Sequence, residues 1–114
     1  MKVQFLDFHC DTEWETYGNG KVALQLVATG EDPETHPGEP IATATVNTDH
    51  RIEIDEIIVK DYSENEGMVA ALVEAGVIQP EFTQVFVGGY GASCARCRLT
   101  DAARVEAFGL TAKA

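Results

Sequence analysis

The stretch Lys60-Asp-Tyr-Ser-Glu-Asn-Glu-Gly-Met-Val-Ala-Ala-Leu-Val-Glu-Ala-Gly76 carries the clearest helix signals in this sequence. Ser63 followed by Glu66 has the spacing of a capping box, in which two side chains satisfy free backbone N–H groups at a helix start. Apolar residues then recur at helical spacing and form one face that must pack on a core: Met68, Val69, Leu72 and Val73. Gly76 suits the left-handed position after the last turn. The stretch therefore predicts a helix over residues 63–76.

The chain before this helix alternates strand-like segments with turn signals. The pattern predicts an Asn-Gly hairpin turn and an acidic loop between strands, with the strands at residues 2–8, 12–17, 21–28, 41–46 and 51–60 and the loop at 29–40. The segment 12–17 is either a second strand or a continuation of the first. In the segment 51–60 the alternation shifts after Ile54, which indicates a β-bulge or a strand end buried on both faces.

The chain after the helix predicts a second hairpin and a second helix. Strands are expected at residues 82–87 and 93–99, with a glycine-rich turn between them. Thr100 can cap a helix over residues 101–108, and the tail from Leu110 to Ala114 is expected to be frayed. The pattern predicts one α+β domain over residues 1–114, with a mainly antiparallel sheet of about five to six strands and two helices, at about 63–76 and 101–108.

The negative charge lies in the first part of the chain. Residues 1–66 hold 15 Asp and Glu against 4 Lys and Arg, whereas residues 67–114 hold 4 of each, so the formal net charge of −11 belongs to the first part. Such an excess opposes direct binding to nucleic acid, which needs a basic face. It favours either simple solubility or attraction to a cationic partner.

Several features indicate a cytoplasmic protein without membrane contact. The apolar run after Lys2 is broken by Asp7 and His9, so no signal peptide is expected, and no apolar run is long enough to span a membrane. The 3 cysteines are an odd number, which suits a reducing compartment better than a disulfide framework.

The motif Lys60-Asp-Tyr-Ser-Glu-Asn-Glu-Gly-Met68, preceded by Val22-Ala-Leu-Gln-Leu-Val and Ile41-Ala-Thr-Ala-Thr-Val-Asn, resembles a small bacterial domain family of unknown function. That family occurs in gut bacteria, phages, plasmids and conjugative elements. The resemblance covers residues 17–76, and it implies no catalytic residue. It implies a setting in mobile genetic elements, where small acidic proteins serve anti-defence or accessory roles.

The spacing Cys94-Ala-Arg-Cys97 is the one with metal or redox chemistry in it. Such a pair supplies two of the four ligands of a structural zinc site. The remaining ligands would come from Cys10 or His9, and from His36 or His50. Redox chemistry needs a thiol at a helix start, and Cys97 lies ahead of the expected cap. Half-buried cysteines without a metal are the third interpretation.

Catalysis has no clear signature. Cys10 or Ser93 could be paired with a histidine as nucleophile and base, but no spacing requires it. The glycines of residues 88–91 lack a phosphate-binding pattern and favour a tight hairpin. We therefore expect a protein that is not an enzyme, with a thiol-dependent enzyme as the weakest alternative.

The acidic residues form three clusters and are the main candidate for a binding surface. A row of carboxylates can meet the Lys and Arg residues of a nucleic-acid channel, while Arg96 and Arg98 could pair with the same acids or with a second copy. The aromatic residues Trp14, Tyr17 and Tyr62 are possible anchors. The candidate acids are Asp11, Glu13, Glu15, Glu31, Asp32, Glu34, Glu53, Asp55, Glu56, Asp61, Glu64 and Glu66.

The leading hypothesis is an acidic, non-enzymatic interaction module from a mobile element. It would bind a basic protein or nucleoprotein complex of the host by charge mimicry and inhibit host defence, as an anti-CRISPR protein does; a homodimer is possible. The alternative is a small zinc-stabilised domain that uses Cys94 and Cys97, with Cys10 as a further ligand; no other cofactor is expected.

Overall fold

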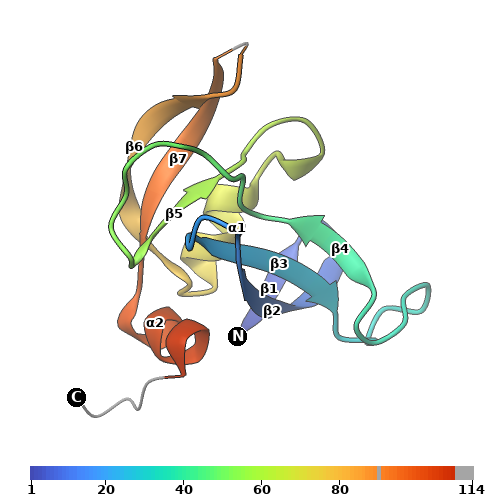
Figure 1. The fold of residues 1–114 in the computed structure, drawn as a ribbon. Coiled ribbons are helices and arrows are strands. Elements are labelled where there is room, and N and C mark those ends of the chain that lie inside the picture. Colours follow the sequence, from blue (N-terminus) through green and yellow to red (C-terminus); the bar gives the residue numbers. More distant parts are fainter. Residues whose placement is uncertain (90, 110–114) are drawn as a thin grey trace.

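The computed structural model describes residues 1–89 and 91–109, and this part of the chain has an α+β fold (Figure 1). It contains two antiparallel sheets, one of four strands and one of three, and two α-helices. The predicted fold class is thus confirmed. The seven strands and their division into two sheets differ from the predicted sheet of about five to six strands.

The first sheet is a meander of strands that are neighbours in sequence. Its order is β1-β2-β3-β4, with β1 at Lys2–Phe5, β2 at Phe8–Thr16, β3 at Val22–Ala28 and β4 at Pro40–Thr43. The Asn-Gly turn joins β2 to β3, with Thr16 opposite Val22, as predicted. The predicted strand 2–8 is wrong, because the chain reverses at Leu6 (φ +55°) and Phe8 begins β2.

The second sheet has the order β5-β7-β6, with β5 at Glu56–Val59, β6 at Ile78–Val87 and β7 at Ala92–Leu99. The predicted strand 51–60 is shortened to β5, and Ile54 outside it is 75% exposed. All four residues of β5 are buried, which agrees with a strand end covered on both faces and not with a bulge.

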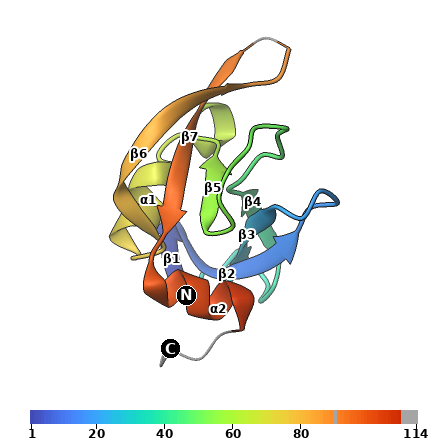
Figure 2. The same ribbon diagram turned by 60° about the vertical axis from the view of Figure 1, so that its left-hand side comes forward.

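A short seam joins the two sheets; we use this name for residues 44–46 and 58–60. Thr45 forms an isolated bridge with Val59, the Val46 N–H donates to the Ile58 carbonyl (3.0 Å), and the Lys60 N–H donates to the Ala44 carbonyl (3.0 Å). One apolar cluster continues across the seam and includes Val3, Leu24, Leu26, Ile57, Val59, Leu72 and Leu99. Figure 2 shows β3 of one sheet beside β5 of the other.

The helix α1 is shorter than predicted and spans Met68–Glu74. Ser63 has a φ of +58° and starts a single 3₁₀ turn, Ser63–Asn65, so the predicted capping box does not form. The cap comes from Asp61, whose carboxylate accepts the N–H groups of Gly67 (2.7 Å) and Val69 (2.9 Å). The helix ends as predicted, because Gly76 (φ +76°) lets the Val77 N–H bond back to the Leu72 carbonyl (2.9 Å).

The helix α2 spans Asp101–Phe108, and its predicted bounds are confirmed. The Thr100 hydroxyl accepts the Ala103 N–H (3.1 Å), which is the expected cap. Neither helix in the described residues has the length and apolar character needed to cross a membrane. The tail predicted to fray lies outside the described residues.

Candidate interaction surface

A row of carboxylates lines the outer face of the four-stranded sheet. Side chains of β2 alternate between faces, so Cys10, Thr12 and Trp14 point toward the core and the intervening acids point outward. The outward residues are Asp11, Glu13 and Glu15, about 7 Å apart along the strand. Glu13 and Glu15 are exposed and have no ion pair within residues 1–89 and 91–109.

The loop after β3 brings a second acidic cluster to one end of this row. The carboxylate of Asp32 accepts the backbone N–H of His9 (2.8 Å) and contacts its ring Nδ1 (3.0 Å). Lys2 pairs with Asp11 (2.6 Å), which raises the pKa of Lys2, and the negative charge of Glu31 adds to this rise. We call the outward acids of β2 together with Glu31 and Asp32 the acidic sheet face: Asp11, Glu13, Glu15, Glu31 and Asp32. Glu34, farther along the same loop, is exposed.

Titration behaviour at this end of the row follows from the contact between His9 and Asp32. The backbone N–H of His9, and then its ring, hold the pKa of Asp32 below its ordinary value. The same ring contact raises the pKa of His9 above its ordinary value of 6.5. The face is thus anionic, with its nearby cations already engaged.

A pocket of about 440 Å³ opens beside the acidic sheet face, between β1, the loop after β3 and the last turn of α1. Its lining is mostly apolar, and Gln4, Glu31 and Glu74 supply polar groups. The Lys2 and His9 side chains at its edge already pair with Asp11 and Asp32. Among the described residues that line the pocket, both cations are therefore already paired.

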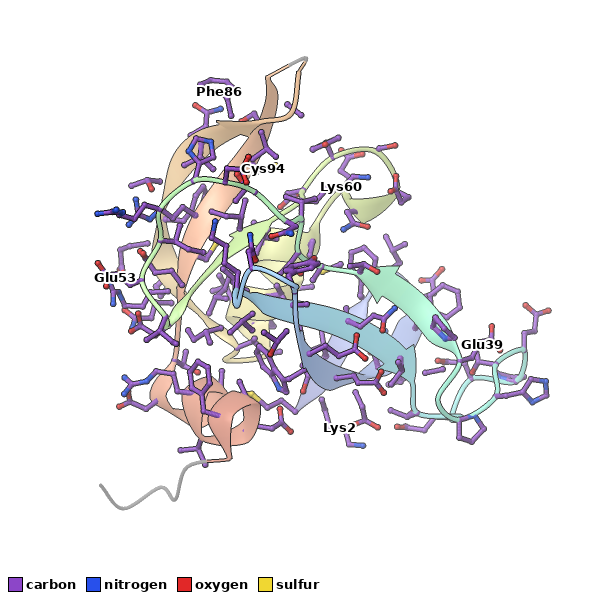
Figure 3. All side chains as sticks on the ribbon, viewed as in Figure 1. Lys2, Glu39, Glu53, Lys60, Phe86 and Cys94 are labelled. Carbon is purple, nitrogen blue, oxygen red and sulfur yellow. The ribbon has the colours of Figure 1, made fainter. Side chains whose placement is uncertain are left out.

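The third predicted cluster lies on the other sheet and is paired with arginines. Arg96 donates to both oxygens of Glu56 (2.8 and 3.1 Å), and Arg98 donates to Asp55 (2.9 Å). The Arg96 bond holds the pKa of Glu56 below its ordinary value. Of the two pairings that the sequence left open for these arginines, the intramolecular one is present. Figure 3 shows Glu53, the exposed member of this cluster, well apart from Lys2.

The acids around the 3₁₀ turn have local roles. Asp61 caps α1, and Glu64 pairs with Lys60, which lowers the pKa of Glu64 to about 2. Glu66 is exposed and has no ion pair among the described residues. Of the predicted acids, therefore, Asp55, Glu56, Asp61 and Glu64 make contacts that stabilise the fold or a local turn.

The predicted aromatic anchors differ in availability. The Trp14 Nε1–H donates to Glu106 of α2 (2.7 Å), and the Tyr17 hydroxyl contacts the Thr45 hydroxyl (2.9 Å). Both side chains thus connect parts of the fold. Tyr62 is 39% exposed, with the Lys60 ammonium 5.1 Å from its ring centre, and is the anchor that remains accessible.

The cysteines do not come together. Cys94 and Cys97 are three residues apart on β7, so their side chains point to opposite faces, and Cys10 lies on the other sheet. Burial raises the pKa of Cys97 to about 12 and of Cys10 to about 11, and it also raises that of Cys94. In the described part of the chain, no three His, Cys, Asp or Glu residues are grouped to hold a metal. The geometry gives no support to the zinc site or to a reactive thiol.

Two exposed aromatic residues were not among the predicted anchors. Phe82 and Phe86 of β6 are 52% and 59% exposed. The sequence held a signal for them, because residues 82–95 contain no charged residue in an otherwise acidic chain.

Comparisons with protein-family models, curated proteins and solved structures gave no match to this chain.

Proposed function

We propose that this protein is an acidic, non-enzymatic interaction module that binds a basic protein surface through its acidic sheet face. The observation that carries the proposal is the row of outward carboxylates on β2, extended by the acids of the loop after β3. These side chains are held by a sheet, so their spacing is fixed before a partner arrives. Preorganisation of this kind lowers the ordering cost of binding.

The distribution of cations supports the same proposal. Most of the basic side chains in the described residues already pair with an acid of the same molecule. They are Lys2, Lys60, Arg96, Arg98 and Arg104. The excess of negative charge therefore produces a field that attracts cationic surfaces and repels nucleic acid.

The partner class follows from this field. Proteins that handle nucleic acid carry Lys and Arg along the path of the phosphates, and a rigid carboxylate row matches such a path in charge. The resemblance of the Lys60–Met68 motif to a mobile-element family adds a setting. In that setting the module blocks a nucleic-acid-handling complex of host defence, as an anti-CRISPR protein does.

Affinity capture with matched variants tests the proposal. The tagged protein, a Glu13→Gln/Glu15→Gln variant and a Glu66→Gln/Glu81→Gln variant would be exposed to nuclease-treated host lysate at low and high salt. The two variants remove equal charge, but only the first removes it from the acidic sheet face. We expect the parent and the second variant to retain the same basic protein, and the first variant to lose it.

Salt provides the second readout, because screening weakens attraction between exposed charges. Release of the captured protein as salt rises is the expected result. Equal loss of binding in both variants would show that net charge alone matters. The absence of any specific protein at low salt would overturn the proposal.

A further inference from the structure

The strand β6 forms an open edge of the three-stranded sheet. Within residues 1–89 and 91–109, the sheet order β5-β7-β6 leaves one side of β6 without a neighbouring strand. Its segment Phe82–Val87 is rich in aromatic and β-branched residues and contains no charge and no proline. An exposed edge of this composition is a template for pairing with another strand. Figure 2 shows β6 and β7 projecting together beyond the rest of the fold.

The register shows which backbone groups of β6 face the open side. The Leu99 N–H donates to the Asp55 carbonyl, so the backbone N–H and carbonyl groups of Leu99, Cys97 and Ala95 face β5. The backbone groups of the residues between them, and of Cys94, face β6. Their partners Val85 and Thr83 point toward β7. Phe82, Gln84 and Phe86 therefore direct their N–H and carbonyl groups outward. The Phe86 carbonyl indeed contacts the His50 ring outside the ladder (2.7 Å).

The same three residues also share one face of the sheet, since they are two positions apart. Phe82 and Phe86 are more than half exposed on that face, on either side of Gln84. The edge thus combines free backbone groups with two unburied aromatic rings. A single exposed apolar residue is ordinary. Two exposed rings on the same face of an unpaired strand form an apolar surface that a partner strand would bury.

We propose that the β6 edge binds the β6 edge of a second copy of this chain, in an antiparallel pair with two-fold symmetry. With the axis perpendicular to the sheet at Gln84, Gln84 lies opposite itself and Phe82 lies opposite Phe86 of the second copy. Outward groups then meet outward groups, and each ring meets a ring on the same face. The His50 ring lies on the outward side of the Phe86 carbonyl, so this pairing requires the His50 side chain to turn away from it.

Charge permits a second copy at this edge. Two chains of net charge −11 repel wherever their acids approach, but residues 82–95 contain no charged residue, and beside Phe86 the acid Asp49 is accompanied by His50. The self-complementary order of residues 82–86 completes the match. This surface is separate from the acidic sheet face, so the two proposals stand or fall independently.

Cysteine cross-linking tests the register. Directly opposite residues in a hydrogen-bonded antiparallel pair have Cα atoms about 5.5 Å apart, within reach of a disulfide. Gln84→Cys should therefore form an intermolecular disulfide under mild oxidation. Thr83→Cys is the matched control, because its two copies would lie about 8 Å apart. Equal cross-linking at both positions, or none at Gln84→Cys, would overturn the register.

Sedimentation equilibrium of the unmodified chain tests the association itself. We expect a monomer–dimer equilibrium that persists or strengthens as salt rises, because screening reduces repulsion between the copies. Phe82→Lys/Phe86→Lys should weaken dimerisation about tenfold or more. Ile54→Lys, which also places a cation at an exposed apolar position, should leave it unchanged. A chain that stays monomeric at all concentrations and salts would overturn the proposal.

Discussion

The segments Asp11–Glu15 and Glu53–Glu56 have similar acidic composition in the sequence, yet they have different roles in the structure. The first lies on the outer face of the meander and leaves Glu13 and Glu15 without an ion pair in the described chain. The second lies at β5, where arginines of β7 bind Asp55 and Glu56. A strand that is distant in sequence therefore decides whether an acid stabilises the fold or remains available for a partner.

The difference has an energetic basis. Glu56 is buried, and a buried carboxylate is costly unless it is paired and hydrogen-bonded. The outward acids of β2 keep their water, so the sheet can leave them unpaired. Substitution of a paired, buried acid such as Glu56 should lower the stability of the fold. Substitution of an outward acid of β2 should weaken binding to a partner.

The largest effect is expected when the arginine of the buried pair is removed. Arg96→Ala leaves Glu56 buried without its main partner, and we expect a loss of about 2 kcal/mol in the free energy of unfolding, measured by urea denaturation. The figure is below that for a fully buried pair, because the Arg96 side chain is 34% exposed. Arg104→Ala breaks an exposed pair with Asp101 and should cause no measurable loss.

The pH dependence of the same pair has a definite sign. The Arg96 bond holds the folded pKa of Glu56 below the ordinary value of 4.5, so the unfolded chain takes up the proton first as pH falls. The contribution of Glu56 is complete above pH 4.5 and is lost as pH falls through the folded pKa. The unfolding free energies of the parent and Glu56→Gln should therefore converge in acid. A gap independent of pH would contradict this assignment.

A smaller effect is expected at Asp61, an acid that sequence reasoning placed in the binding surface. Asp61→Ala removes the side-chain cap of α1 and should cost about 1 kcal/mol of unfolding free energy. Asp61→Asn keeps an acceptor oxygen and should cost less. Urea denaturation separates the two variants. Unchanged stability in both would show that the cap contributes nothing.

The smallest effect is expected at the centre of the acidic sheet face. Glu13→Gln/Glu15→Gln should change the unfolding free energy by less than about 0.5 kcal/mol, with a small gain because like charges on one face repel. The same denaturation measurement checks this. A clear loss of stability would show that Glu13 and Glu15, like Glu56, stabilise the fold.

Local signals predicted those parts of the fold that depend on nearby residues. The cap at Thr100, the Asn-Gly hairpin and the end of α1 at Gly76 each rest on contacts within a few positions. The start of α1 was missed because Asp61, and not Ser63, reaches its first turn. The turn at Leu6 and Asp7 carries no glycine or asparagine, and Asp7 is its one turn-favouring residue, so the local signal is weak.

The candidate site could be predicted only in part, for the same reason. Alternation along β2 identifies the outward acids. The sequence also allows the arginines of residues 96 and 98 to pair with acids of the same molecule. It does not say which acids they pair with, because that depends on the register of β5 against β7. The separation of Cys94 and Cys97 can be inferred from the sequence, because the predicted strand over residues 93–99 places residues three apart on opposite faces.

The seam between the sheets has a consequence for the order of folding. Strands β1 to β4 pair only with sequence neighbours, and β6 pairs with its neighbour β7, whereas β5 pairs with β7 across α1 and β6. Closing such a long loop costs entropy before any contact repays it, so local hairpins should form early and β5 should dock late. Docking of β5 also brings Val59 to Thr45. We therefore expect the docking of this four-residue strand to be the slow step in the folding of the chain.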